Sequence, residues 1–183
     1  MTRASVCVFC GSRAGRRPAY QDAATEVGRM LAAQEWRLVY GAGDVGLMGA
    51  CARAAQADGA NTFGVIPVHL LRAEVGKTDL TQFVVTENMH ERKKVMFMNS
   101  DAFVVLPGGA GSLDEFFEVL TWRQLGLHVK PIFLLNTEGY WTPLIHLLDH
   151  VIAENFADPE VMDYLRVVPD VAALTSGLRA ALS

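Results

Sequence analysis

"LPGGAGSLDEFFEVL", residues 106–120, is the segment that decides the fold. It joins the end of an apolar run to a glycine turn and then directly to a helix. Such a junction is suited to an anion, because free backbone N–H groups and the positive end of the helix dipole face the same point. The same fifteen residues carry three carboxylates, on Asp114, Glu115 and Glu118. The sequence therefore places negative charge beside a site that favours binding negative charge.

Short apolar strands and helices alternate along the rest of the chain. Strands are predicted at residues 5–9, 37–43, 61–67, 82–87, 101–109 and 130–136, the last clear strand. Helices are predicted at residues 19–34, 46–60, 88–99, 112–125, 142–154 and 170–182. Continuously apolar strands separated by helices form a parallel sheet that is covered on both faces. The sequence therefore predicts an α/β fold, a Rossmann-like doubly wound parallel sheet with helices on both faces, in a single nucleotide-binding domain over residues 1–183.

Ligands of such sheets bind beyond the carboxyl ends of the strands, near the point where the strand order reverses. Four predicted strand exits carry glycine or polar residues, at 11–12, 41–49, 87–93 and 108–115. These exits are where we expect the chemistry of the protein.

Composition excludes several classes of function. The net charge of −4 lacks the basic excess that a nucleic-acid binder uses to neutralise phosphates. No apolar run approaches the ~20 residues of a membrane span, and the apolar run at the N-terminus is too short for a secretory signal. An odd count of three cysteines favours a reducing compartment. We therefore expect a cytoplasmic protein without nucleic-acid or membrane partners.

Two small clusters of functional residue types have less specific interpretations. Cys7 and Cys10 have C-x-x-C spacing, but they fall within and at the end of a strand, which separates the thiols on opposite faces. No His and Cys spacing indicates a metal site, so none is predicted. The basic cluster of Arg13, Arg16 and Arg17 fits a solvated face and a functional role equally well.

The segment GAGDVG, residues 41–46, satisfies the G-x-G-x-x-G pattern between a strand and a helix. It lies in the second strand–helix unit, and the next strand ends without the acidic residue that would hold a ribose. The glycines are therefore interpreted as allowing a tight turn that gives a ligand access to the backbone, with simple packing left open for Gly41. No G-x-x-x-x-G-K-[ST] motif occurs, which excludes a P-loop enzyme.

The glycine loop of the opening segment predicts a phosphate site. Gly108, Gly109 and Gly111 can adopt positive φ and bring N–H groups close to an anion without interference from a Cβ. Ser112 stands where a helix N-cap is expected. Ser112 and Glu115 then have the spacing of a capping box, which is the alternative to a functional role for Glu115.

Two further features place charge near this loop. Asp114 fits a first-turn acid that the helix dipole favours, whereas Glu118 lies on nearly the same helix face as Glu115. In NMHERKKVMF, residues 88–97, Arg92 shares a face with Met89 and Met96, so it is expected against apolar surroundings. A strand exit next to the strand of the glycine loop would let Arg92 and Glu115 converge on one pocket.

Three motifs together resemble a known family. PGGAGSLDE (107–115), MHERK (89–93) and GLMG (46–49) are similar to the motifs of the LOG family, the cytokinin-activating nucleoside 5′-monophosphate phosphoribohydrolases. Ser112 replaces the usual threonine of the PGGxGTxxE motif, and Ala42 and Asp44 vary the glycine run before GLMG. The resemblance runs over nearly the whole chain. The older label of lysine decarboxylase has no support here, because no context marks a lysine for a Schiff base to pyridoxal phosphate.

The resemblance implies which residues act. Arg92 and Glu115 would be catalytic, and the enzyme would be a homodimer without cofactor or metal. The substrate would contact Glu74, Lys93, Gly109, Ala110, Gly111, Ser112, Leu113, Asp114 and Thr121. Further candidates are Ser12, Gly46, Met48, Gly49, Met89 and Glu118.

The expected reaction is hydrolysis of the N-glycosidic bond of adenosine or cytokinin nucleoside 5′-monophosphates to free base and ribose 5-phosphate. That bond breaks through an oxocarbenium-like sugar, which a nearby carboxylate stabilises. Glu115 would supply the carboxylate, Arg92 would position the substrate, and the glycine loop would hold the 5′-phosphate. Two alternatives remain: a non-catalytic nucleotide or cofactor carrier on the same fold, and a dehydrogenase that uses GAGDVG.

Overall fold

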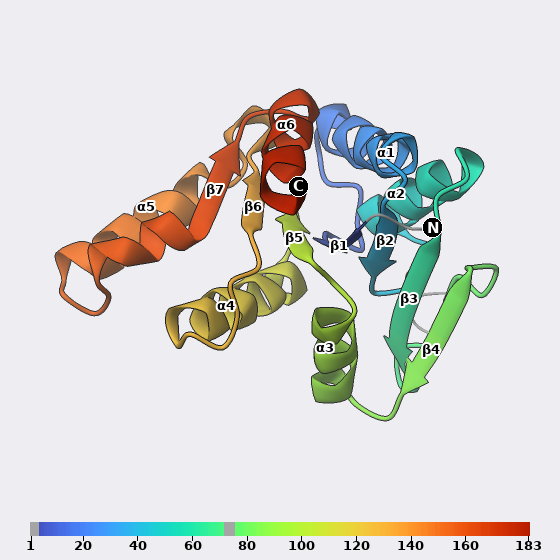
Figure 1. Ribbon diagram of the computed structural model, residues 1–183, viewed down its shortest axis with the longest axis horizontal. Coiled ribbons are helices and arrows are strands. Elements are labelled where there is room, and N and C mark those ends of the chain that lie inside the picture. The colour runs from blue at the N-terminus through green and yellow to red at the C-terminus, as the bar shows by residue number, and fades with distance from the viewer. Residues whose placement is uncertain (1–3, 72–75) are drawn as a thin grey trace.

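The computed structural model describes residues 4–71 and 76–183, which fold around one parallel sheet (Figure 1). Over these residues the strand order is β4-β3-β2-β1-β5-β6-β7. The strands are β1 (Ser5–Phe9), β2 (Arg37–Tyr40), β3 (Thr62–Pro67), β4 (Gln82–Thr86), β5 (Ala102–Val105), β6 (Ile132–Leu135) and β7 (Leu165–Val168). The helices are α1 (Pro18–Ala33), α2 (Gly46–Ala57), α3 (Met89–Met98), α4 (Ala110–Gln124), α5 (Thr142–Ala153) and α6 (Val171–Leu182), with 3₁₀ turns η1 (Thr137–Gly139) and η2 (Pro159–Tyr164). The predicted α/β fold is confirmed.

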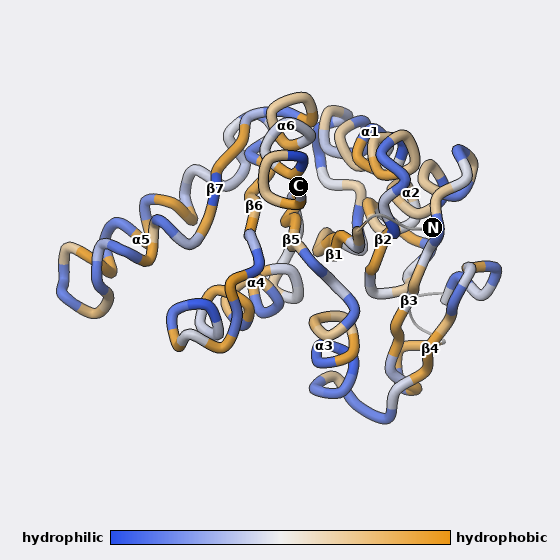
Figure 2. Tube along the Cα trace, viewed as in Figure 1, coloured by the Kyte–Doolittle hydropathy of each residue, from blue (hydrophilic) through white to orange (hydrophobic). Residues whose placement is uncertain are grey.

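The strands are apolar because both faces of the sheet are covered (Figure 2). Helices α1, α2 and α6 pack on one face, where Val8, Leu38 and Val104 lie among their side chains. Helices α3, α4 and α5 pack on the other face, around Val39 and Phe103. Alternate residues of each strand therefore belong to different cores.

The two thiols of the C-x-x-C pair follow this alternation. Cys7 lies in the core under α3, α4 and α5, whereas Cys10 lies in the core under α1, α2 and α6. Both are free and buried. Burial raises the pKa of each thiol well above its usual range, with a smaller contribution from neighbouring negative charge. The sheet therefore separates the pair, as the strand periodicity predicted.

The prediction that residues 130–136 form the last strand was wrong, because β7 pairs with β6 beyond it. Leu165 is buried in β7, but the next two residues are exposed at the edge of the sheet. This edge strand consequently lacks the continuous apolar run by which the other strands were recognised. It also follows directly on the η2 turn, with no glycine to mark its start.

The strand order places the switch point of the sheet between β1 and β5. From β1 the chain proceeds outward through β2 and β3 to β4, and then returns to form β5 on the other side of β1. Phe9 of β1 lies in register with Val105 of β5, so both strands end at the same level. The segments that leave these strands therefore start side by side, in the position where ligands of open α/β sheets bind.

Helices α1 and α2 approach each other closely because Gly28 has no side chain. A Cβ at this position would collide with the carbonyl oxygen of Cys51 and lie 2.9 Å from Cβ of Ala54. We expect Gly28→Ala to lower the free energy of unfolding by about 1–3 kcal/mol, although alanine favours helices. Urea denaturation measures this change. As a control, Glu26→Ala on the exposed side of α1 should stay within about 0.5 kcal/mol of the parent; equal stability of both variants would contradict the packing argument.

Candidate functional site

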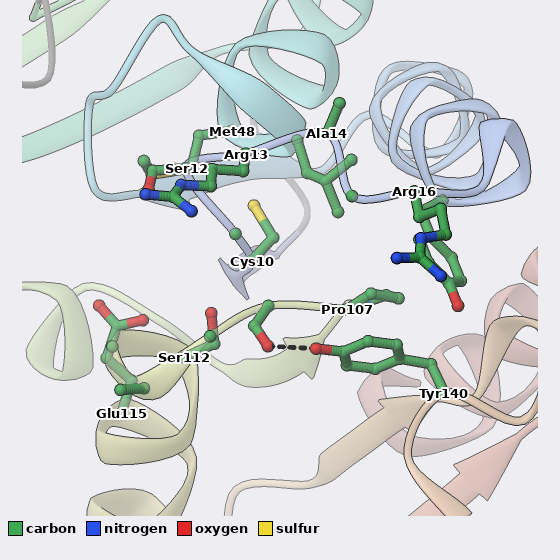
Figure 3. Close-up of a pocket in the computed structure, with 18 of the residues that line it drawn as sticks. Cys10, Ser12, Arg13, Ala14, Arg16, Met48, Pro107, Ser112, Glu115 and Tyr140 are labelled. Atoms are coloured by element: carbon green, nitrogen blue, oxygen red, sulfur yellow. Dashed lines mark hydrogen bonds between the residues drawn. The ribbon is translucent and has the colours of Figure 1, made fainter.

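A cavity of about 710 Å³ opens at the switch point between β1 and β5 (Figure 3). Its walls come from the segment after β1, the segment after β5 and the first turns of α1, α2, α3 and α4. Among the residues predicted for the site, the cavity is lined by Ser12, Met48, Met89, Arg92, Gly109, Ala110, Gly111, Ser112 and Glu115.

The first turn of α4 forms the floor of this cavity without a side-chain cap. The helix begins at Ala110, and its N-cap, Gly109, makes no side-chain cap hydrogen bond. The first N–H groups of a helix have no partner within it, so they remain as donors at the cavity wall. The positive end of the helix dipole adds to this preference for an anion.

The structure overturns the capping box that Ser112 and Glu115 were predicted to form. Because α4 starts two residues earlier than expected, Ser112 is its third residue and lies 3% exposed inside the first turn. Ser112 is therefore not the N-cap, and Glu115 is not placed to reach back to one. The alternative that reduced Glu115 to a helix cap is thereby removed. Figure 3 shows both side chains on the floor of the cavity, under Ser12 and Arg13.

The glycines of the loop do not use the positive φ that is open to them. Gly108 is required by packing, because a Cβ there would collide with the Ser112 hydroxyl and lie 2.9 Å from the backbone nitrogen of Gly11. A Cβ on Gly109 or Gly111 would meet no atom within 4 Å. These two glycines thus leave open space at the start of α4, where a ligand can approach the backbone.

Arg92 is buried, although it belongs to the charged run of α3. Its side chain donates from Nε to the carbonyl oxygen of Val65 at 3.0 Å and from Nη2 to that of Gly41 at 2.7 Å. Nη1 lies 3.8 Å from the sulfur of Met89. Backbone carbonyls at the ends of β2 and β3 therefore hold the guanidinium at the edge of the cavity, which it lines.

The reason given for the convergence of Arg92 and Glu115 was wrong. Strand β4, which leads into α3, is not next to β5 but at the edge of the sheet, separated from it by β3, β2 and β1. Helix α3 instead packs on β3 on its way back to β5, and this crossing brings Arg92 to the ends of β2 and β3. Both residues nevertheless line the same cavity.

Lys93 forms ion pairs with two of the three carboxylates of the opening segment. Lys93 Nζ lies 3.1 Å from Asp114 and 2.6 Å from Glu118, which joins α3 to α4. Partial burial lowers the pKa of Lys93, but the hydrogen bonds to Glu118 and Asp114 outweigh it and raise that pKa overall. None of these three residues lines the cavity, whereas Glu115 does.

The remaining predicted residues lie outside the cavity wall. Leu113 is half-buried on α4, and Thr121 is exposed near the end of the same helix. Gly46, at φ +57°, packs where a Cβ would collide with the backbone of Ser12, and Gly49 packs on the carbonyl of Asp44. The interpretation that GAGDVG exposes its backbone to a ligand thus fails at Gly41 and Gly46, which pack on protein atoms. Glu74 lies outside the described residues.

Sequence reasoning missed two contributions to the cavity wall. Arg13, Arg16 and Arg17 line it directly after β1, and their clustering at a strand exit was a usable signal. Tyr140 also lines it and donates a hydrogen bond from its hydroxyl to the carbonyl of Gly108 at 2.6 Å. Tyr140 follows β6 at a distance in sequence from every motif, so nothing in the sequence marked it. Of the residues described along the cavity, four arginines thus share its wall with Glu115.

Within residues 4–71 and 76–183, no three His, Cys, Asp or Glu side chains are grouped to hold a metal ion. None of the helices described there has the length and apolar character needed to cross a membrane.

Comparisons with known proteins relate the chain to one family. A family profile described as "Possible lysine decarboxylase" matches residues 48–178. A protein of Oryza sativa subsp. japonica, named "Probable cytokinin riboside 5'-monophosphate phosphoribohydrolase", is 44% identical over 173 residues, which cover 94% of this chain and 76% of the relative. A cytokinin riboside 5′-monophosphate phosphoribohydrolase of Arabidopsis thaliana is 42% identical over 173 residues, covering 94% and 81%.

Solved structures with the same fold are more distant in sequence. The Moco carrier protein of Chlamydomonas reinhardtii superposes with a TM-score of 0.74 at 21% identity, over 98% of this chain and 97% of that one. A molybdenum cofactor binding protein of Rippkaea orientalis gives 0.74 at 19% identity, over 100% and 99%. At this level of identity the likeness shows the fold alone.

The contact between Gly41 and Arg92 can be tested without a ligand. We expect Gly41→Ala to lower the free energy of unfolding by about 1–3 kcal/mol, because its Cβ would collide with Nη2 of Arg92. A crystal structure of the variant should show the guanidinium displaced from Val65. Gly111→Ala is the matched control, since its Cβ meets no atom within 4 Å, and it should be as stable as the parent or slightly more stable. An unmoved Arg92 in Gly41→Ala would contradict the prediction.

Proposed function

The chain belongs to the LOG family of cytokinin riboside 5′-monophosphate phosphoribohydrolases, and from this premise we propose that it hydrolyses the N-glycosidic bond of adenosine or cytokinin nucleoside 5′-monophosphates. The products are the free base and ribose 5-phosphate. One observation carries the proposal: Glu115, Arg92 and the uncapped first turn of α4 all line one cavity. An anion site and a carboxylate in one cavity match a substrate that has a phosphate at one end and a glycosidic bond at the other.

The cleavage step determines what Glu115 has to do. As the glycosidic bond lengthens, positive charge develops on the ribose ring, and a carboxylate beside it lowers the energy of that state. The same carboxylate orients the water that attacks the anomeric carbon and accepts its proton. Glu115 lines the cavity one helical turn after Ser112, so it faces the sugar when the phosphate binds at the start of α4.

Arg92 supplies a cation of fixed position. The carbonyl groups of Val65 and Gly41 hold the guanidinium from the protein side, and an arginine keeps its charge at any physiological pH. In the proposed mechanism this positive charge orients the substrate and offsets the repulsion between the Glu115 carboxylate and the dianionic phosphate.

The phosphate anchors the substrate away from the bond that breaks. Space beside Gly109 and Gly111 lets its oxygens approach the N–H groups of the first turn of α4. Binding energy obtained at this end holds the glycosidic bond against Glu115, which accelerates the reaction by positioning. Lys93 with Asp114 and Glu118 supports the site by joining α3 to α4. Glu74, Leu113 and Thr121 remain predictions that rest on the resemblance.

The first test measures base release from AMP and from isopentenyladenosine monophosphate by chromatography. Glu115→Gln keeps the shape of the side chain and removes its charge, so we expect the rate to fall at least a hundredfold. Arg92→Ala should also abolish release. Arg92→Lys keeps the positive charge but changes its position, and circular dichroism of both variants shows whether a loss of activity comes from a loss of fold. Glu160→Gln, the same chemical change at an exposed position in η2, is the matched control and should retain full activity.

The alternative function is a carrier that binds a nucleotide or cofactor without turnover. Nucleotide binding without base release, unaffected by Glu115→Gln, would establish the carrier and refute the hydrolase. Base release that requires both Glu115 and the 5′-phosphate would establish the hydrolase.

The proposal includes a cytoplasmic homodimer. Four exposed apolar residues gather where α3 and α4 end: Met98, Leu125, Leu127 and Val129, each at least 65% exposed. Phe97 packs edge-to-face on Trp122 at 4.9 Å, and Lys130 Nζ donates to the carbonyl of Phe97, so these segments lie together. An apolar face of this kind supports association with a second copy of the chain. The free, buried thiols fit a reducing compartment.

Leu125→Glu combined with Val129→Glu should convert the dimer to a monomer, because charges on an apolar interface lose their hydration. Light scattering coupled to size-exclusion chromatography gives the mass directly. Glu154→Lys, an exposed change of charge after α5, is the control and should leave the dimer intact. A monomeric parent protein, or a double variant that remains dimeric, would contradict this assignment.

A further inference from the structure

Residues Ser12–Arg17, which we call the arginine segment, form the wall of the cavity opposite the start of α4. Figure 3 shows Arg13 and Arg16 on one side of the cavity and Ser112, Glu115 and Tyr140 on the other. Arg13 lies over the end that holds Glu115, and Arg16 lies toward Tyr140. The two walls thus present a pair of guanidinium groups to an uncapped helix N-terminus.

The protein fixes the shape of the arginine segment at several points. Before it, the carbonyl of Gly11 accepts from the N–H of Leu47 at 3.0 Å, and the backbone of Ser12 packs on Gly46. Within it, Gly15 adopts φ +77° and packs against the ring of Tyr20. A side chain at this position would disturb both the backbone conformation and the contact. At its end Arg17 pairs with Glu138 at 3.0 Å. The segment is therefore held in place before any ligand binds.

The charges of the three arginines are not equivalent. Glu138 offsets Arg17, whereas no carboxylate of the residues described here forms an ion pair with Arg13 or Arg16. Two cations beside a cavity, with no protein anion on them, form a wall that attracts negative charge. Arginine binds phosphate oxygens through two parallel N–H groups, which gives geometric selectivity as well as affinity.

We propose that Arg13 and Arg16 bind the 5′-phosphate of the nucleotide from the side opposite α4, and that they make the site selective for nucleotides over nucleosides. This inference rests on the proposed function for the identity of the ligand. The first turn of α4 favours the phosphate through its N–H groups and the partial positive charge of the helix dipole. Two guanidinium groups add full positive charges. These charges attract the dianionic phosphate of a nucleotide but gain nothing from a neutral nucleoside.

Calorimetry tests the inference independently of catalysis. In a Glu115→Gln background, which removes turnover, the titrants are AMP, adenosine and ribose 5-phosphate. Arg13→Ala and Arg16→Ala should each lower the affinity for AMP and for ribose 5-phosphate about tenfold, and the double variant should lower it further. Adenosine affinity should not change, and the salt dependence of AMP binding should become shallower. Arg29→Ala, which removes an exposed arginine on α1 outside the cavity, is the matched control and should match the parent.

The outcomes separate this inference from the proposed function. Phosphate-dependent binding that is lost in the double variant supports the inference, even in a protein that releases no base. Equal affinity of the parent and the double variant for AMP overturns it, as does an equal loss of adenosine affinity, which would indicate a general change in the wall. Base release by the parent with unchanged KM in Arg13→Ala and Arg16→Ala would leave the hydrolase standing and refute the role of the arginines.

Discussion

The contact between the segments that leave β1 and β5 is the constraint on which the rest of the site depends. Gly11 donates to the carbonyl of Pro107 at 3.0 Å, and a Cβ on Gly11 would lie 3.2 Å from Cα of Gly108. At Gly11 the two segments touch through backbone atoms, which leaves no room for a side chain at this position. From this contact the arginine segment continues on one side and α4 on the other, and the cavity is the space between them.

The charged side chains around the cavity differ in how deeply they are buried and in which groups they contact. Arg92 is buried, and the carbonyl groups of Val65 and Gly41 replace part of its lost hydration. Asp114 and Glu118 are joined to Lys93 beside the cavity, so one lysine offsets part of their negative charge before a ligand arrives. Glu115 is the carboxylate of this helix that lines the cavity. The negative charge that the sequence places beside an anion site is thus divided in space: Asp114 and Glu118 pair with Lys93 outside the cavity wall, and Glu115 lies on that wall.

The sequence predicted the fold and much of the site because both depend on local patterns. Alternating apolar strands and helices indicated the parallel sheet, and the glycine loop and MHERK indicated residues that do line one cavity. The edge strand β7 was missed because half of its side chains face outward. The start of α4 was placed two residues late because Ser112 resembles an N-cap. Ser112 instead packs on Gly108, which in turn lies against the backbone nitrogen of Gly11, a contact between segments distant in sequence. Tyr140 reaches Gly108 across 32 residues of sequence, a contact that no local pattern encodes.

The geometry also explains why the site would require a phosphate far from the bond that it cleaves. Among the described residues, Glu115 is the carboxylate on the cavity wall, so a neutral nucleoside would lack the charged contact that a phosphate makes at the start of α4. In the proposed complex the phosphate would lie between α4 and the arginine segment, and Tyr140 donates a hydrogen bond to the Gly108 carbonyl beside that position. Tyr140 in turn packs edge-to-face on Tyr20 of α1, with ring centroids 5.3 Å apart, and Tyr20 supports Gly15 of the arginine segment. Both walls of the anion site are therefore braced by the same pair of tyrosines, so the distance between them is set by the packed interior rather than by the ligand.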